Sequence, residues 1–190
     1  LLTLFSFALL TVFAQCGFDA ARNKQLQNPN FVLQEKASEA RIQEIINSNA
    51  GVSYKGGNIY TIPVVVHVLH LGEAIGTGTN ITDAQIQSSI DRLNEVYRGL
   101  DTNSPIDFEV EFALAKRDPD CNATNGINRI DASGVPNYTA SGAIFDSIGA
   151  DQNTLKDLSG WPETDYMNIW IVSEIDGNNG GGGIQGYANF

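Results

Sequence analysis

The side chains best suited to metal chemistry in this sequence are His67 and His70, the only two histidines of the chain. Imidazoles are common zinc ligands, so two of them close in sequence raise the question of a metal site. Both lie in the run YTIPVVVHVLH at residues 60–70, which is typical of a buried strand. Side chains three positions apart on a strand point to opposite faces, so the two rings cannot converge on one ion. The pattern therefore predicts buried structural histidines.

Complete catalytic patterns are absent from the sequence. It contains no HExxH zinc motif, no GxSxG nucleophile elbow, no P-loop and no dinucleotide-binding glycine pattern. No serine or cysteine has an identifiable base close to it in sequence. The residues themselves therefore do not predict an active site within this chain.

Cys16, in the segment AQCGFD, is one of two cysteines. A thiolate is a good zinc ligand, so a leader segment could use it to block a metal site elsewhere. A disulfide with Cys121, or an unpaired thiol, accounts for the same residue without such a function. The residues alone leave these alternatives open.

The segment DPDCNATNG, residues 118–126, alternates oxygen-bearing side chains as calcium loops do. An EF-hand loop beginning at Asp118 would need glycine in place of Ala123 and glutamate in place of Arg129. The segment therefore predicts a turn-rich loop and no cation site. Three triplets match the glycosylation pattern, and they begin at Asn80, Asn122 and Asn137.

Composition and the first residues indicate a secreted globular protein. The 190-residue chain is 42% hydrophobic with a formal net charge of −11, and such an acidic surface disfavours nucleic-acid binding. The apolar run LLTLFSFALLTVFA at residues 1–14 is too short to span a bilayer. It fits a signal peptide whose basic start is missing, with cleavage after Ala14. Gln15 disfavours a lipid anchor at Cys16, so we expect an extracellular protein with no stable membrane anchor.

Residues 15–58 are expected to form a prosegment. Asn28 followed by Pro29 is typical of a helix start, and a stripe of apolar residues follows on one face. Residues 47–58 are rich in Gly, Ser and Asn. We therefore place a boundary there, with a folded domain at 59–190.

The domain alternates predicted strands and helices. After the strand at 60–70 comes the strongest local signal, a helix from Thr82 to Gly99 with capping-box spacing between Thr82 and Gln85. Further strands are expected at residues 107–115, 126–130, 166–172 and 183–190, with a helical turn at 153–158. This order predicts an α/β domain with a right-handed crossover.

Five segments together resemble one protein family. They are YTIPVVVHVLH, NITDAQIQSSIDRLNEVYRGL, DFEVEFALAKRDPDCNATNGINRI, WPETDYMNIWIV and GIQGYANF. In this order they are similar to the pappalysin (cytophagalysin) metalloproteases, which are secreted zinc endopeptidases of the metzincin type, and the chain looks like a bacterial member. The likeness extends over residues 60–190. Cys16 and Gly17, followed by a polar helix, are also similar to the prosegments of bacterial members.

The resemblance implies the upper (N-terminal) subdomain of a metzincin-like zincin: a twisted, mostly parallel sheet with an antiparallel edge strand and a long backing helix. Residues 60–69 would be the first strand and 82–99 the backing helix. In that family the next helix carries HExxHxxGxxH, which would follow Phe190. The chain is thus expected to be an N-terminal fragment without the zinc ligands or the general-base glutamate. Met167 lies in a predicted strand and cannot be the methionine of the family's Met-turn.

The resemblance also implies site residues. Backbone groups of the edge strand would hold an extended peptide antiparallel to them. The residues of this substrate-binding strand would be Gly186, Tyr187, Ala188 and Asn189. An ordinary edge strand is the alternative. The Cys16 thiolate would act as a cysteine switch on zinc in the latent form.

The function expected from the resemblance is that of a secreted zinc-dependent metalloendopeptidase precursor acting on peptide or protein substrates. Zinc-activated water would attack the peptide carbonyl with glutamate as the base. Zinc is the expected cofactor of the whole protein, calcium is compatible with it, and the fragment is expected to be inactive alone. A secreted non-catalytic binding module with the same α/β sheet is the alternative. The sheet face that the catalytic helix would cover is expected to be an exposed apolar patch.

Overall fold

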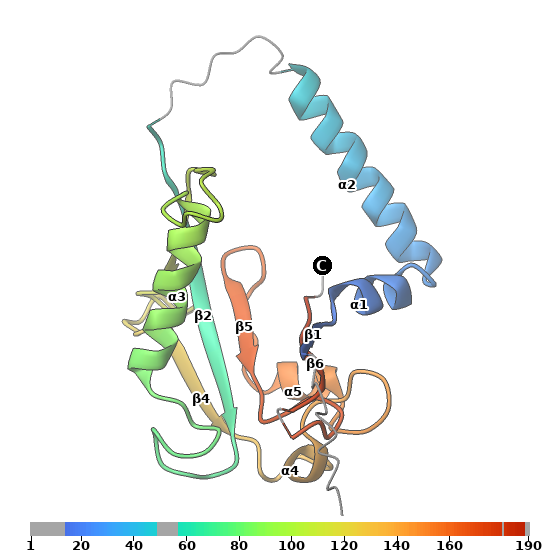
Figure 1. Ribbon diagram of the computed structural model, residues 1–190, viewed down its shortest axis with the longest axis vertical. Helices are drawn as coiled ribbons and strands as arrows, with labels where there is room; N and C mark the ends of the chain where they lie inside the picture. The colour runs from blue at the N-terminus through green and yellow to red at the C-terminus, as the bar shows by residue number, and fades with distance from the viewer. Residues whose placement is uncertain (1–13, 49–56, 180, 189–190) are drawn as a thin grey trace, which may run out of the picture. The chain divides into compact units, whose positions relative to one another are not determined.

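The computed structural model describes residues 14–48, 57–179 and 181–188 of the chain (Figure 1). These residues form two compact units. The first unit combines the leader, Leu1–Ser48, with the end of the chain, Asn178–Phe190. The second unit is Asn49–Gly177 and contains the larger sheet.

In the described residues of the second unit, four parallel strands form the sheet. They are β2 (Tyr60–His70), β3 (Val110–Leu114), β4 (Ile127–Asp131) and β5 (Met167–Ile171), with β2 paired to each of the others. Residues 64–69 of β2 are all buried. A continuous run of β-branched residues is the sequence pattern of a strand covered on both faces, and the predicted α/β fold with a mostly parallel sheet is confirmed.

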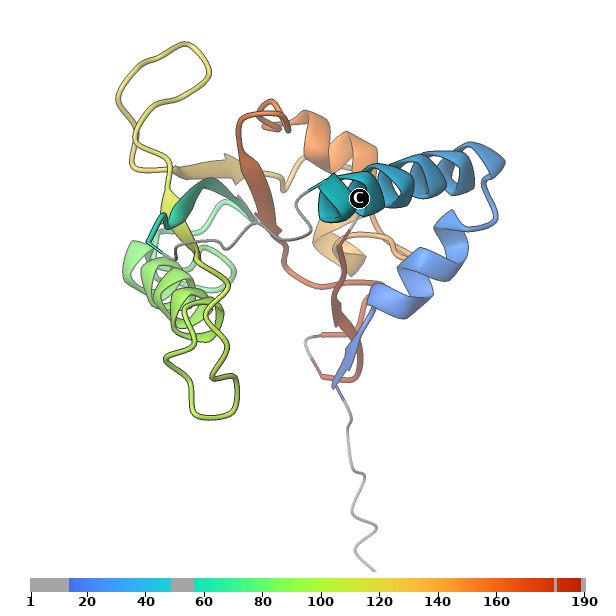
Figure 2. The same ribbon diagram turned by 90° about the horizontal axis from the view of Figure 1, so that it is seen from above.

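β3 and β4 share one edge of β2. The Val64 carbonyl accepts a hydrogen bond from Ala115 N at 2.8 Å, and Val66 N donates to the Gly126 carbonyl at 2.9 Å. Backbone groups two residues apart on a strand point to the same side, so both partners lie on the same edge. A β-carbon on Gly126 would lie 2.6 Å from Ala115 N, so glycine is required at this junction. Residues 116–125 leave the sheet between the two strands as a projecting loop (Figure 2).

Helix α3, Asp83–Tyr97, covers one face of this sheet. Its N-cap Thr82 accepts from Gln85 N at 3.2 Å, and the Gln85 side chain accepts from Thr82 N at 2.9 Å, so the predicted capping box is present. Gly99 follows the helix at φ +65°, a conformation that favours glycine. The buried core between helix and sheet consists of Val64, Val66, Val68, Ile86, Ile90, Phe112 and Leu114.

The opposite face of β2 is also buried, so the expected exposed apolar patch is wrong at this strand. Leu69 has no exposed surface and packs with Tyr138 of α4, Tyr138–Ser141, a helix that the sequence did not predict. Leu155 of α5, Gln152–Asp157, joins the same cluster. The segment between β4 and β5 thus covers the sheet where a helix from further along the chain was expected.

The described residues of the first unit form two helices and a two-stranded sheet. Its elements are β1 (Ala14–Cys16), α1 (Phe18–Gln25), α2 (Pro29–Ser48) and β6 (Gly183–Gly186). Helix α2 begins at the proline that predicted its start, whereas α1 and β1 were not predicted. Arg22 of α1 and Glu35 of α2 form an ion pair. None of the helices in the described ranges is long and apolar enough to cross a membrane.

Candidate functional site

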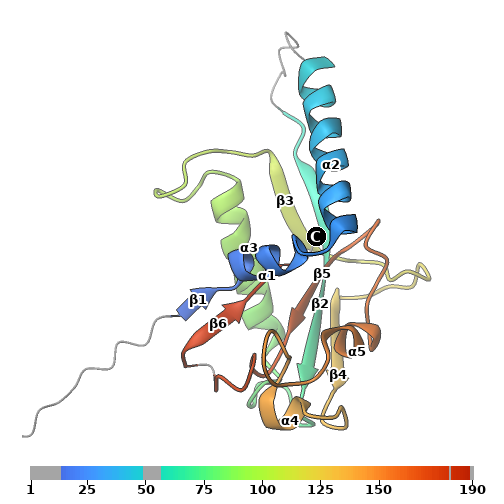
Figure 3. The ribbon, with the colours of Figure 1, turned by 90° about the vertical axis from the view of Figure 1, so that its right-hand side faces the viewer.

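The leader pairs with β6 (Figure 3), whose last residue, Gly186, is the first of the four residues that the resemblance assigns to the substrate-binding strand. β1 and β6 run parallel, with Ala14 opposite Gly183 and Cys16 opposite Gly186. The ladder continues past the strand, since Gly17 N donates to the Gly186 carbonyl at 2.8 Å. Within the described residues, β6, which was expected to be an antiparallel edge strand, has a parallel partner. A strand edge bonded in this way is not open to another extended peptide.

Gly17 makes this pairing sterically possible. It is buried, and a β-carbon there would lie 2.7 Å from Ile184 Cγ2 and 3.1 Å from the Gly186 carbonyl oxygen. The Ile184 carbonyl in turn accepts from Asn178 Nδ2 at 2.8 Å. The Cys-Gly pair in the leader was visible in the sequence, but nothing in it indicated contact with Ile184.

The structure places the predicted substrate-strand residues at the end of β6 and beyond it. Gly186 is the last residue of the strand, and Tyr187 and Ala188 follow it outside any strand. Asn189 lies outside the described residues. Cys16 is the last residue of β1, level with Gly186. The binding roles of all these residues stay predictions.

In the second unit, His67 is fully buried against two tryptophans. Its ring stacks on Trp170 with centroids 5.0 Å apart and meets Trp161 edge-on at 6.4 Å. His67 Nε2 lies 2.9 Å from Asn168 Oδ1. Asn168 Nδ2 donates to the carbonyls of Trp161 and Tyr166, so its Oδ1 is the acceptor and His67 Nε2 carries the proton.

His67 Nδ1 consequently bears a lone pair, and it is buried without a hydrogen-bond partner among the described residues. Burial lowers the pKa of His67, and this outweighs the opposing effect of the hydrogen bond to Asn168. The ring is therefore a neutral structural group, as predicted. His70 is half-buried at the end of β2, where its Nδ1 accepts from Gly72 N at 3.0 Å.

Replacing His67 by phenylalanine is expected to remove part of the acid sensitivity of the fold. The unfolded chain takes up a proton on this imidazole below about pH 6.5, whereas the folded chain takes it up only at lower pH. Stability therefore falls as the pH drops through this window. Phenylalanine keeps an aromatic ring against Trp170 without titrating.

Urea midpoints of unfolding at about pH 7.5 and about pH 5 should differ less in H67F than in the wild type. H70F serves as the control, and equal pH dependence in both variants would contradict the assignment.

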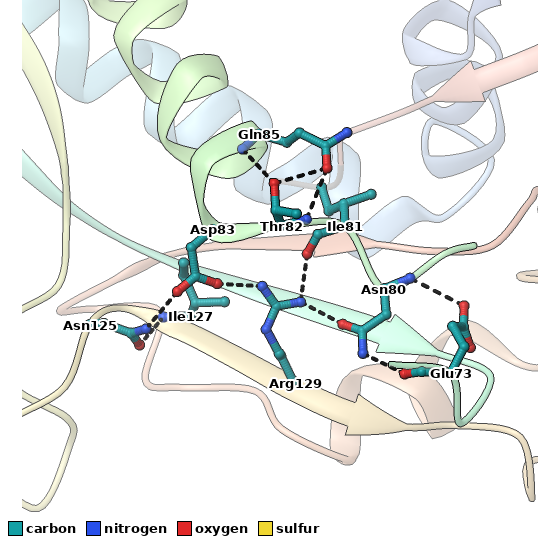
Figure 4. A network of polar contacts seen from close by, with 9 residues as sticks. All are labelled: Glu73, Asn80, Ile81, Thr82, Asp83, Gln85, Asn125, Ile127 and Arg129. Carbon is teal, nitrogen blue, oxygen red and sulfur yellow. Dashed lines mark hydrogen bonds and ion pairs between the residues drawn. The ribbon is translucent and has the colours of Figure 1, made fainter. Parts of the chain in front are cut away.

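A polar network joins the loop after β2 to α3 and β4 (Figure 4). The hydrogen bond from the Thr79 hydroxyl is the main reason why the pKa of Glu73 falls to about 2. Asn80 is 3% exposed and donates to the Glu73 carbonyl at 2.8 Å, so the glycosylation triplet at this position is buried. Arg129 donates to Asn80 Oδ1 at 2.5 Å and pairs with Asp83 at the start of α3. These charged residues therefore have structural partners.

The segment compared with calcium loops is a turn. Asp118 Oδ1 accepts from the backbone N of Asp120 at 3.0 Å and of Asn122 at 2.7 Å. An aspartate that bonds the backbone two residues ahead is characteristic of an Asx turn, which confirms the prediction of a turn-rich loop. Cys121 in this loop is exposed and free.

Solved structures that are similar to the chain over part of its length include the three that follow. A structure of mirolysin in complex with compound 9 is 34% identical over 60% of this chain and 42% of that chain, with a TM-score of 0.46. Mature mirolysin of Tannerella forsythia in complex with a cleaved peptide is 33% identical over 60% and 42%, with a TM-score of 0.42. A promirolysin mutant of Tannerella forsythia is 28% identical over 82% and 49%, with a TM-score of 0.47. The chain spans less than half the length of these structures. No protein-family model and no curated protein matches it.

Proposed function

We propose that this chain is the N-terminal part of a secreted zinc-dependent metalloendopeptidase precursor of the pappalysin (cytophagalysin) type. The order of the five quoted segments supports the family, and the parallel sheet with α3 on one face supports the fold that the resemblance implies. Peptide or protein substrates belong to the proposal, and mirolysin of Tannerella forsythia is itself known in complex with a cleaved peptide. The signal peptide, the extracellular location and the lack of a membrane anchor are parts of the same proposal.

The observation that carries the proposal is the pairing of β1 with β6. A leader bonded to the substrate strand keeps substrate out until it is removed, as a precursor requires. The direction of β1 supports a latent precursor, because the leader runs parallel to β6 whereas substrate is expected to run antiparallel to it. A peptide bound in reverse presents its amide groups in the wrong order for the cleavage chemistry. The leader can therefore occupy the strand without being cut as a substrate.

Zinc does not fit the described residues by themselves. Within residues 14–48, 57–179 and 181–188, no group of three or more His, Cys, Asp or Glu side chains could hold a metal ion. A catalytic zinc site needs three protein ligands with a position left for water. The family resemblance implies that the zinc ligands of the whole protein lie beyond Phe190, and we propose Cys16 as the leader residue that blocks the zinc.

The experiment compares the 190-residue chain with the longer chain that its gene encodes. We expect the coding sequence after Phe190 to contain HExxHxxGxxH. The short chain should bind no stoichiometric zinc and cleave no peptide, while the long chain should bind one zinc and start latent. Zinc content is measured by elemental analysis, and cleavage is followed with a quenched fluorescent peptide, with and without chelator.

Substitution of Cys16 by alanine in the long chain tests the leader. The lag before activity should shorten several-fold, because the thiolate no longer occupies a coordination position. C121A is the matched control, since it removes an exposed free thiol and should leave the lag unchanged. Equal lags in C16A and the wild type would contradict the switch. Chelator-sensitive proteolysis by the 190-residue chain, or the absence of a zinc motif after it, would contradict the larger proposal and favour the binding module.

A further inference from the structure

Asp176 lies near the end of the second unit, and its carboxylate is surrounded by backbone donors. It accepts hydrogen bonds from four consecutive backbone N–H groups at 2.9–3.3 Å. The donors, here called the carboxylate cradle, are the N–H groups of Phe145, Asp146, Ser147 and Ile148. Successive N–H groups that converge in this way form an anion-binding concavity.

The cradle belongs to a closed loop, residues 142–150. Ala150 N donates to the Gly142 carbonyl at 2.7 Å, and Ile144 N donates to the Ala150 carbonyl at 2.9 Å, so the two ends of the loop are bonded to each other. The Gln152 side chain also donates to the Ile144 carbonyl at 2.8 Å. The loop therefore has a defined shape, and its N–H groups converge because of that shape.

The backbone around Asp176 is adapted to this contact. Asp176 has φ +52°, a left-handed conformation that a non-glycine residue seldom adopts, and Gly177 follows at φ +67°. Asp176 N donates to the Ala143 carbonyl, and Gly177 N donates to the Ser141 carbonyl, each at 3.0 Å. An unfavourable backbone conformation persists where surrounding contacts determine it, and here these contacts include the four hydrogen bonds to the carboxylate.

The electrostatics agree with the geometry. Partial burial opposes ionisation of Asp176, yet the hydrogen bonds from Phe145, Ser147, Asp146 and Ile148 together lower the pKa of the carboxyl group. Asp176 is thus held as an anion at neutral pH. It lies two residues before Asn178, where the segment that carries β6 begins.

We propose that Asp176 is a positioning residue, whose carboxylate, held in the carboxylate cradle, fixes the point where the chain leaves the sheet unit toward β6. The cradle is thereby a receptor for a carboxylate group, occupied by one from the same chain. The inference rests on the proposed function, in which β6 pairs with the leader and ends at Gly186, the first residue assigned to substrate.

The test replaces Asp176 by glycine in the 190-residue chain. Glycine tolerates the positive φ, so the substitution removes the carboxylate without adding backbone strain. Amide hydrogen exchange of the four cradle residues should accelerate about tenfold or more, since each amide loses a bond to a charged acceptor. The backbone order parameter of Asn178 should fall in the same variant. Sodium formate at about 0.1 M should restore slow exchange of the cradle amides, whereas sodium chloride at equal ionic strength should not. Formate is not joined to the chain, so it should leave the order parameter of Asn178 low.

Two further variants complete the experiment. D176N puts an uncharged amide in the cradle, so exchange should be intermediate and formate should have no effect. D157N removes an equal charge from an exposed residue, so its cradle amides should exchange as fast as those of the wild type. If D176G does not fold, D176N is compared with D157N. Faster hydrogen exchange of the four cradle amides in D176N would then support the positioning role.

Three results would overturn the inference: unchanged cradle exchange in the Asp176 variants, equal rescue by chloride and formate, or an unchanged order parameter at Asn178 after the carboxylate is removed. None of these measurements involves zinc or proteolysis. A failure of the protease proposal and a failure of the positioning role are therefore distinguishable.

Discussion

Replacement of Gly142 by alanine is expected to lower the free energy of unfolding by more than about 4 kcal/mol, or to prevent folding altogether. A β-carbon at this position would lie 1.9 Å from the Glu174 carbonyl oxygen and 2.5 Å from its carbon. Both are backbone atoms, which a rotamer change cannot move away. The residue also has φ +63°, which alanine adopts only with strain. The contact joins the loop at residues 142–150 to the segment after β5, so relief of the clash would separate them.

Urea unfolding followed by circular dichroism measures this effect. Gly134 provides the matched control, because a β-carbon there would meet no atom within 4 Å. G134A should change the unfolding free energy by less than about 0.5 kcal/mol. Similar values for the two alanine variants would show that the close approach at Gly142 relaxes at little cost.

The second large effect is expected at Tyr138, which has no exposed surface. Its hydroxyl donates to the Leu69 carbonyl at 2.6 Å and accepts from Ser173 N at 3.0 Å. Y138F would leave both backbone groups without this partner while it keeps the ring in place. Each unsatisfied buried group costs about 1–3 kcal/mol, so a loss of about 2–4 kcal/mol is expected.

The matched control for this variant is Y60F, because Tyr60 is 64% exposed at the start of β2. Its hydroxyl is free to bond water in both states, so the unfolding free energy should change little. Urea midpoints measured in the same buffer compare the two phenylalanine variants. A loss at Tyr138 no larger than the loss at Tyr60 would show that other groups or water replace the hydroxyl.

The elements that the sequence predicted best are those whose signals are local. Helix α3 has its N-cap Thr82, a capping partner three residues later, and an apolar stripe that includes Ile86 and Ile90. β2 has a run of apolar residues long enough to show that both its faces are covered. In each case the residues that decide the structure lie within one or two turns, or within one strand.

The parts that the sequence did not predict depend on contacts between distant residues. Helix α4 has four residues and is held by Tyr138, whose partners Leu69 and Ser173 lie far from it in the chain. No periodic pattern can indicate so short an element. The burial of the second sheet face was missed for the same reason, since it results from the path of the segment between β4 and β5.

In the candidate site too, local features could be read from the sequence and contacts between distant residues could not. Cys16 and Gly186 were each selected from the sequence, but their alignment in one ladder was not. β1 has three residues and β6 has four, so neither strand has enough alternation to reveal its partner or direction. The close approach of Gly17 to Ile184 depends entirely on that pairing.

The parallel ladders also determine when the chain can fold during its synthesis. Thr61 bonds to Glu111, 50 positions later, and His67 bonds to Asn168, 101 positions later. At roughly 5–20 residues per second, β2 would wait several seconds on the ribosome for its last partner. β1 is made before β2, and its own partner β6 is made after every other strand. The sheet of the second unit thus stays open until β5 has been made. An open chain is the form that can be threaded across a membrane, as export, which we propose for this protein, requires.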